Sequence, residues 1–245
     1  MNLQSFKEQP YVYGYRIRLF MLKYGFAKNL HKKYIDFSLK RTRKEAEKLS
    51  DLTIESITKN RFLSRHRYTL LYALCRFLKP QTIVETGVGL GVSSYFILQA
   101  LHDNGFGELY SIDYPGSVYS SDAGIKINEG TYASQDGLPG FLVPDNLREH
   151  WTLILGKSED KLHFLCERLG AIDLFFHDSE HTYQNMLEEY KTVWPYIRKN
   201  GILASHDIGW NDAFKDFSEE NNYTPIISQN GFGLIIRAKK DIMPL

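Results

Sequence analysis

The chain has 245 residues, and its hydrophobic content of 43% with 14% aromatic residues is typical of a globular protein and excludes a disordered one. The formal net charge is +1, but the first 50 residues hold 12 basic and 4 acidic side chains, so the remainder is acidic. No apolar run reaches the roughly 18 residues that crossing a bilayer requires, and an acidic body argues against nucleic acid as the partner.

A basic helical extension is predicted for residues 1–60. Within it, Ala27–Leu49 combines apolar residues at helical spacing with many Lys and Arg residues, which indicates a basic amphipathic helix. Its charge could bind nucleic acid, acidic lipid or an anionic substrate, although a solvated helix face is the simpler interpretation. The aromatic residues between Tyr11 and Phe20 could roof an acceptor pocket or cover an interface, which would make the extension the contact of a homo-oligomer.

Residues 61–245 are predicted to form one domain. A helix over Ser64–Lys79 ends at Pro80, and short apolar runs then alternate with helical patterns. The predicted strands are Thr82–Glu85, Leu109–Asp113, Trp151–Leu155, Ile172–His177 and Gly201–Ser205, and the predicted helices are Val92–Leu101, Asp160–Leu169, Tyr183–Arg198 and Asp212–Glu220. This alternation predicts a parallel sheet that is covered on both faces. The two cysteines, Cys75 and Cys166, lie in apolar helical patterns, which indicates buried thiols and a cytoplasmic protein.

The C-terminal tail departs from this alternation. Thr224–Ser228 and Leu234–Ala238 are strand-like runs joined by Asn230-Gly231-Phe232-Gly233, which predicts an antiparallel hairpin. The fold class is therefore α/β, a Rossmann-like, open and mostly parallel seven-stranded sheet with a C-terminal antiparallel hairpin and an N-terminal helical extension. One long segment, Tyr114–Val143, has no clear periodicity and is predicted to be a functional lid or a mobile loop.

A glycine loop joins the first strand of the sheet to the next helix, with the sequence Glu85-Thr86-Gly87-Val88-Gly89-Leu90-Gly91. Its glycines allow a ligand to approach bare backbone at a helix N-terminus, unless they serve only a tight turn. A dinucleotide-binding loop would carry its third glycine at position 92, which is Val92, and Glu85 would repel a pyrophosphate. Asp113 ends the next strand, where a carboxylate can accept hydrogen bonds from ribose hydroxyls. The pattern favours a nucleoside ligand with positive charge near the glycines.

On these residues the chain resembles the class I S-adenosylmethionine-dependent methyltransferases, whose first motif is an acidic residue followed by G-x-G-x-G. In that family the segment corresponding to Gly156-Lys157-Ser158 contacts the adenine, and Lys157 replaces the commoner acidic residue, which leaves Ser158 or a backbone group as the contact. A P-loop is excluded because Trp151 stands where its first glycine is required. The resemblance implies that S-adenosylmethionine is bound by Glu85, Gly87, Gly89, Gly91, Ser93, Asp113, Ser158 and Asp178.

Histidine and aspartate side chains follow the fourth and fifth strands, as His177-Asp178-Ser179-Glu180-His181 and as His206-Asp207. The carboxyl ends of central strands form the floor of the ligand crevice in an open α/β sheet. These segments are similar to a small-molecule O-methyltransferase subfamily (methyltransferase domain 24 type) that carries D-x-x-H-x-Y and H-D there. The resemblance implies that His181 is the general base and Asp178 orients a ligand, with His206 as the second catalytic candidate. Histidines that merely bond to loops are the alternative, and Tyr183 is expected to pack on the following helix.

A metal site is the second implication of this region. Catechol-type and macrolide-sugar O-methyltransferases, to which it is similar, bind Mg²⁺ through carboxylates, which implies Asp178 and Asp207 as ligands here. The catechol-type enzymes follow the second Asp with Asn, whereas Ile208 stands there and Asn211 comes later. The segment His177–His181 also fits the H-x-x-E-H signature of inverted zinc proteases, but that motif requires a helix and here it begins in a strand.

The sequence therefore predicts an S-adenosylmethionine-dependent methyltransferase that methylates a hydroxyl of a small-molecule acceptor, of sugar or natural-product type. A metal-dependent hydroxylase-like enzyme on the same fold is one alternative, and a non-catalytic cofactor-binding relative is another. A nicotinamide oxidoreductase is the least favoured.

Overall fold

The computed structural model describes residues 26–47, 67–114, 119–121, 124–126, 139–228 and 231–237. The chain divides into two compact units, Met1–Arg41 and Thr42–Leu245. Helix α2 (Phe26–Glu47) spans the division and matches the predicted basic helix, whereas the aromatic residues 11–20 lie outside the described ranges. The predicted boundary between residues 60 and 61 stays a prediction. Within the described ranges, no helix combines the length and the apolar character that crossing a bilayer requires.

A seven-stranded sheet forms the centre of the second unit, in the order β5-β2-β1-β6-β7-β9-β8. Its strands are β1 (Thr82–Thr86), β2 (Glu108–Asp113), β5 (Trp151–Leu155), β6 (Ile172–His177), β7 (Ile197–Ser205), β8 (Ile226–Ile227) and β9 (Gly233–Ile236). The first five strands in this order are parallel, and β9 runs antiparallel to both β7 and β8. The predicted fold class is confirmed.

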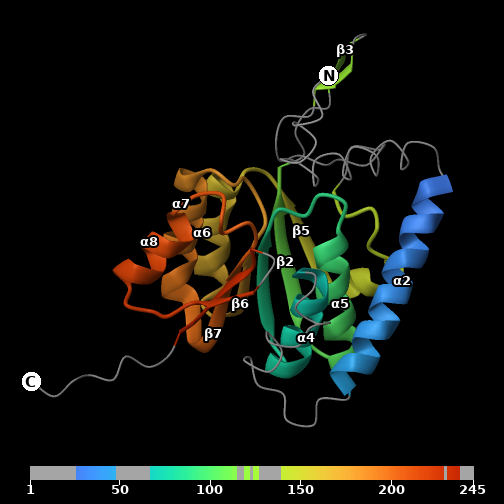
Figure 1. The fold of residues 1–245 in the computed structure, drawn as a ribbon, viewed down its shortest axis with the longest axis horizontal. Coiled ribbons are helices and arrows are strands. Elements are labelled where there is room, and N and C mark those ends of the chain that lie inside the picture. Colours follow the sequence, from blue (N-terminus) through green and yellow to red (C-terminus); the bar gives the residue numbers. More distant parts are fainter. Residues whose placement is uncertain are drawn as a thin grey trace, which may run out of the picture. The chain divides into compact units, whose positions relative to one another are not determined.

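Helices cover both faces of the sheet (Figure 1). Helices α4 (Arg67–Leu78) and α5 (Val92–Asn104) lie on one side, and α6 (Ser158–Leu169), α7 (Tyr183–Val193) and α8 (Ala213–Glu220) lie on the other. Every residue of β6 is buried because the strand has a helical layer on each face, which explains the apolar run Leu174–Phe176 at its centre. Phe175 of β6 packs in one core cluster with Tyr190 and Phe217 of the second helical layer.

One predicted helix ends earlier than expected. The pattern predicted a helix over Tyr183–Arg198, but α7 ends at Val193, and a 3₁₀ turn (η4, Trp194–Tyr196) follows. Pro195 lacks the N–H that would continue the helix, and Ile197 already belongs to β7, paired with Ile172 of β6. The prediction was wrong there because a buried Ile fits the apolar face of a helix and a strand equally well.

The end of the predicted lid is attached to the glycine loop. Gly140 donates its backbone N–H to the Gly89 carbonyl over 2.9 Å, and Leu142 donates to the Leu90 carbonyl over 3.1 Å. A 3₁₀ helix, η3 (Asp145–His150), then leads into β5. Earlier in the same segment, strands β3 (Tyr119–Ser121) and β4 (Gly124–Lys126) form a separate antiparallel pair. Most of the remaining lid lies outside the described residues.

Candidate active site

The glycine loop passes directly against the segment that follows β6. Gly87 has a φ of +82°, and a β-carbon added there would lie 2.1 Å from the Asp178 carbonyl oxygen. The backbone N–H of Asp178 in turn donates to the Thr86 carbonyl over 2.8 Å. Only glycine meets both demands, because the backbone is left-handed and the space is taken. The loop and Asp178 are therefore parts of one site.

Asp113 shapes the glycine loop from the end of β2. Its Oδ2 accepts hydrogen bonds from the backbone N–H of Val88 (2.6 Å) and of Gly89 (2.9 Å). Burial raises the pKa of Asp113, and these two amides oppose that rise. Among the described residues no hydrogen bond to Oδ1 is found, so this oxygen can serve the ribose contact predicted for Asp113.

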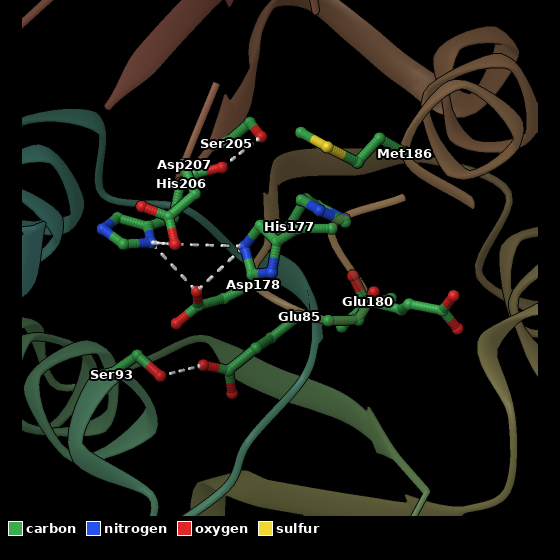
Figure 2. Close-up of polar contacts among 12 residues, drawn as sticks. Glu85, Ser93, His177, Asp178, Glu180, Met186, Ser205, His206 and Asp207 are labelled. Atoms are coloured by element: carbon green, nitrogen blue, oxygen red, sulfur yellow. Dashed lines mark hydrogen bonds and ion pairs between the residues drawn. The ribbon is translucent and has the colours of Figure 1, made fainter. Parts of the chain in front are cut away.

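Glu85 lies deeper than its predicted role requires. Its carboxylate is fully buried and accepts hydrogen bonds from three hydroxyl groups, those of Ser93 (2.6 Å), Ser94 (2.6 Å) and Ser111 (2.7 Å). Burial raises the pKa of Glu85 to about 7, against the effect of these hydroxyls. Figure 2 shows the Ser93 hydroxyl directed at this carboxylate. Glu85 and Ser93 were predicted to bind the cofactor directly. In the structure their side chains instead form hydrogen bonds within the protein.

The segment Gly156–Ser158, which was predicted to contact the adenine, leads into α6, whose first residue is Ser158. The Gly156 N–H donates to the Asp113 carbonyl over 2.9 Å, which brings the end of β5 beside the end of β2. The Ser158 hydroxyl is directed toward α7, where it donates to Asn185 Oδ1 over 3.4 Å. The backbone of this segment is thus close to Asp113, while the Ser158 side chain has a partner of its own.

Four side chains from the ends of β6 and β7 converge, and we call Asp178, His181, His206 and Asp207 the His–Asp cluster. His206 Nδ1 lies 3.3 Å from Asp178 Oδ1 and 3.1 Å from Asp207 Oδ2. His181 Nε2 lies 3.7 Å and 3.6 Å from the same two oxygens. The side chains are between 13% and 26% exposed, so the cluster is sheltered but open to a ligand. Figure 2 shows Asp178, His206 and Asp207 directed toward one another.

His181 is the member of the cluster whose ring nitrogen is left for a ligand. Its Nε2 is buried and has no hydrogen-bond partner within the described part of the chain. Burial lowers the pKa of His181, and the charge of Asp178 opposes that effect only in part. A lowered pKa favours the neutral imidazole, which is the form that a general base requires.

Trp210 is a site residue that the sequence analysis did not single out. Its ring centroid lies 5.2 Å from that of His181, although the Trp210 side chain is 71% exposed. The exposed ring beside His181 offers an aromatic face on which a ligand could stack. In the sequence, Trp210 stands out only because it follows Asp207 by three residues, and this position does not predict that its side chain is exposed.

Glu189 is a second residue that the sequence did not reveal. Its Oε2 lies 2.7 Å from His177 Nδ1 and accepts from the Thr86 hydroxyl over 2.5 Å, and its Oε1 accepts from Ser179 over 2.7 Å. Burial alone would raise the pKa of Glu189, but the charge and hydrogen bond of His177 and the hydroxyl donors lower it. This buried pair joins β1, β6 and α7 beneath the His–Asp cluster.

His177 is therefore structural. Because it ends a strand while Glu180 is exposed, the two do not form the helical H-x-x-E-H site of an inverted zinc protease, and that interpretation is excluded.

Asn211 and Tyr183 form hydrogen bonds next to the cluster without belonging to it. Asn211 Nδ2 donates to the His181 carbonyl (3.1 Å), and Asn211 Oδ1 accepts from the Ala213 N–H (2.9 Å), so this side chain is not a member of the cluster. The Tyr183 hydroxyl donates to Asp216 of α8 over 2.9 Å, so the tyrosine at the start of α7 contacts the next helix in the chain.

Three members of the His–Asp cluster could together hold a metal ion. Donor atoms of Asp178, His181 and His206 all lie within 4.8 Å of one another, and Asp207 Oδ2 is adjacent. The two carboxylates suit Mg²⁺, whereas the imidazoles are ligands that Mg²⁺ seldom uses.

An open sheet with a glycine loop after β1, a carboxylate after β2 and acid–base groups after β6 and β7 defines the class I methyltransferase fold. A family model described as "Methyltransferase domain" matches residues 84–208, which is just over half of the chain. The protein belongs to this methyltransferase family, as its sequence predicted. No curated protein matches the sequence.

Solved methyltransferases share the fold at low sequence identity. The calicheamicin methyltransferase CalS11 is 18% identical over 80% of this chain and 91% of its own, with a TM-score of 0.50. The O-methyltransferase TomG of Streptomyces achromogenes, in complex with S-adenosylmethionine, is 14% identical over 82% and 89%, with a TM-score of 0.50. The S-adenosylhomocysteine-bound methyltransferase PaMTH1 of Podospora anserina is 19% identical over 84% and 88%, with a TM-score of 0.51.

Proposed function

We propose that the protein transfers a methyl group from S-adenosylmethionine to a hydroxyl of a small-molecule acceptor, of sugar or natural-product type. The observation that carries the proposal is the contact between Gly87 and Asp178, which puts the cofactor loop next to the His–Asp cluster. The cofactor-bound relatives TomG and PaMTH1 support the choice of cofactor, and TomG supports the choice of a hydroxyl.

The cofactor side of the site is formed by the glycine loop and by Asp113. The loop backbone lies against the methionine part, and Asp113 Oδ1 accepts from the ribose while Oδ2 stays on the loop. Glu85, together with Ser93, fixes the start of α5 below the loop and acts on the ligand through it. Gly89, Gly91 and the backbone from Gly156 to Ser158 complete this side.

On the acceptor side, the hydroxyl oxygen attacks the methyl carbon as the bond from that carbon to sulfur breaks, leaving the neutral thioether. His181 Nε2 takes the hydroxyl proton, and Asp178 and Asp207, at 3.7 and 3.6 Å, stabilise the imidazolium. The sulfonium is already activated, so positioning and this proton transfer account for most of the catalysis. A cation held by Asp178, His206 and Asp207 would lower the pKa of the acceptor hydroxyl.

Trp210 supplies the contact that selects the acceptor. Its exposed ring stands beside His181, and an aromatic face binds a sugar ring or an aromatic acceptor by stacking. This placement supports a ring-bearing acceptor whose hydroxyl reaches His181.

Calorimetry with S-adenosylhomocysteine tests the cofactor assignment. The wild-type protein should bind, and Asp113→Ala should bind at least about tenfold more weakly, because one charge-assisted hydrogen bond contributes about 1.5–3 kcal/mol. Asp145→Ala, at an exposed position on η3, is the matched control and should bind like the wild type. Absence of binding by the wild type overturns the proposal. Product mass then separates an added methyl group from the added oxygen that a hydroxylase would give.

We also propose a cytoplasmic location and a domain boundary near residue 60. Cys75 and Cys166 are both free and buried, which supports a reducing compartment. Oligomerisation through the extension stays a prediction, and sedimentation of the full chain tests it.

A further inference from the structure

We propose that Asp178, His206 and Asp207 form a metal site that selects a divalent first-row transition ion, such as Mn²⁺, Fe²⁺, Co²⁺ or Zn²⁺, over Mg²⁺. This metal site lies within the proposed active site. Only the position of the ion beside the acceptor rests on the proposed function. The set includes an imidazole nitrogen close to both carboxylates, whereas Mg²⁺ takes oxygen donors.

The distances from His206 to the two carboxylates are those of neighbouring ligands on one ion. With metal–ligand bonds of about 2.1 Å, adjacent ligand atoms lie about 3.0 Å apart in an octahedron and about 3.4 Å apart in a tetrahedron. His206 Nδ1 lies 3.1 Å from Asp207 Oδ2 and 3.3 Å from Asp178 Oδ1, so the imidazole already has the separation of a neighbouring ligand from each carboxylate oxygen.

The donor types favour a transition ion. Mg²⁺ takes oxygen ligands in near-ideal octahedral geometry and keeps several waters, whereas imidazole suits zinc, iron, nickel and copper. One imidazole and two carboxylates therefore bind a transition ion more tightly than Mg²⁺ at the same site. His181 Nε2, farther from both carboxylates, remains the base for the acceptor proton.

The backbone holds the three ligands in place. The His206 N–H donates to the His177 carbonyl (3.0 Å), and the Asp178 N–H donates to the Thr86 carbonyl (2.8 Å). Asp207 has a left-handed φ of +52°, and the Trp210 N–H donates to its carbonyl over 3.0 Å. Such fixed ligands reduce the ordering that metal binding requires.

Binding of Co²⁺ to the full chain, after removal of metals with a chelator, tests the inference independently of activity. The protein should develop the visible absorption of ligated Co²⁺, and a large molar excess of Mg²⁺ should leave that absorption unchanged. Displacement of Co²⁺ by Mg²⁺ at comparable concentration would overturn the inference, as would the absence of the absorption, which would leave His206 as a partner of two carboxylates only.

His206→Asp converts the set to carboxylates alone and makes the test specific. It should weaken Co²⁺ binding by at least about tenfold and strengthen Mg²⁺ binding in calorimetry. The matched control is His163→Asp on α6, an exposed position that should leave both ions unaffected. Equal metal preferences in His206→Asp and the wild type contradict the inference. Binding of S-adenosylhomocysteine is measured on the wild type and on every variant. A wild type that does not bind it would overturn the proposed function, whereas the Co²⁺ experiment would still test the metal site.

Discussion

Glu85 carries a titratable group in a place that water does not reach, and three serine hydroxyls from α5 and β2 are its hydrogen-bond partners. A buried carboxyl is stabilised in its protonated form, which is why burial raises the pKa of Glu85 to about 7. At the scale of single residues, this group links the protonation of the protein to its stability.

The sign of that linkage follows from the direction of the shift. The folded pKa is above the unfolded value of 4.5, so the stabilisation is fully present below pH 4.5 and is lost as the pH rises through 7. Compared with Glu85→Gln, the wild type should therefore lose about 2 kcal/mol of unfolding free energy between pH 5.5 and pH 8. Urea denaturation at both pH values measures this difference. Glu159→Gln, at an exposed position on α6, should show no such change, and a pH-independent difference for Glu85→Gln would contradict the prediction.

His181 should affect chemistry without affecting cofactor binding. Loss of a general base in His181→Asn is expected to lower kcat by about 10²–10⁴-fold, because the amide that replaces the imidazole cannot take up the acceptor proton. Single-turnover methyl transfer and S-adenosylhomocysteine calorimetry separate the two effects. A variant with normal kcat would show that another group takes the proton.

Trp210 should affect the acceptor and little else. Removing its exposed ring in Trp210→Ala should raise the acceptor KM by about 2- to 10-fold and leave cofactor affinity unchanged. Phe164→Ala provides the comparison, since Phe164 is a similarly exposed aromatic residue on α6 and is not a member of the His–Asp cluster. An unchanged KM in Trp210→Ala would remove this residue from the acceptor site.

At the scale of elements, the chain order of strands and helices could be predicted because burial on both sheet faces imposes apolar runs, as in β6. The strand-end positions of Asp178, His181, His206 and Asp207 followed from the same argument. Partners that depend on side-chain direction could not be predicted. Glu189 appears in the sequence as one acidic residue of an amphipathic helix, and only the packing of α7 on β6 places it beside His177.

Gly87 joins two of these elements, and its substitution tests that junction. Gly87→Ala should reduce both S-adenosylhomocysteine and Co²⁺ binding, because a β-carbon 2.1 Å from the Asp178 carbonyl forces the glycine loop and the cluster apart. Gly105→Ala is the matched control, since its φ of +79° is nearly the same but no atom lies within 4 Å of the added carbon. The control should cost only about 1 kcal/mol of stability in thermal denaturation. Equal effects of the two variants would show that backbone strain alone is responsible.

At the scale of the whole molecule, Asp103 connects the end of α2 to the sheet-covering helices. Its carboxylate accepts two hydrogen bonds from Arg43, over 2.6 and 2.7 Å, and one each from Tyr72 (2.7 Å) and Gln99 (3.0 Å). Burial would raise the pKa of Asp103, but the Arg43 and Tyr72 hydrogen bonds lower it. All four residues belong to the second unit, so one basic residue of the first 50, Arg43, serves the fold of the acidic body.

Removal of this carboxylate should be more costly than removal of its cationic partner. Asp103→Ala leaves Tyr72 and Gln99 without their acceptor as well as Arg43, and should lower the unfolding free energy by about 1–3 kcal/mol. Arg43→Ala should cost less, because Arg43 is partly solvent-exposed and the carboxylate keeps two other donors. Urea denaturation of the two variants gives the order, and a larger loss in Arg43→Ala would contradict it.

The closeness of Gly91 and Gly140 has a consequence for how this sequence can evolve. A β-carbon on Gly91 would lie 2.6 Å from the Cα of Gly140, and a β-carbon on Gly140 would lie 2.1 Å from the ring of Trp151. Trp151 is held in turn, since its Nε1 donates to the Ser111 hydroxyl over 2.9 Å and Ser111 donates to Glu85. A smaller residue at position 151 would permit a side chain at 140 but not at 91. Substitutions in the lid and the sheet are therefore coupled: position 151 must become smaller before position 140 can gain a side chain, and position 91 stays glycine.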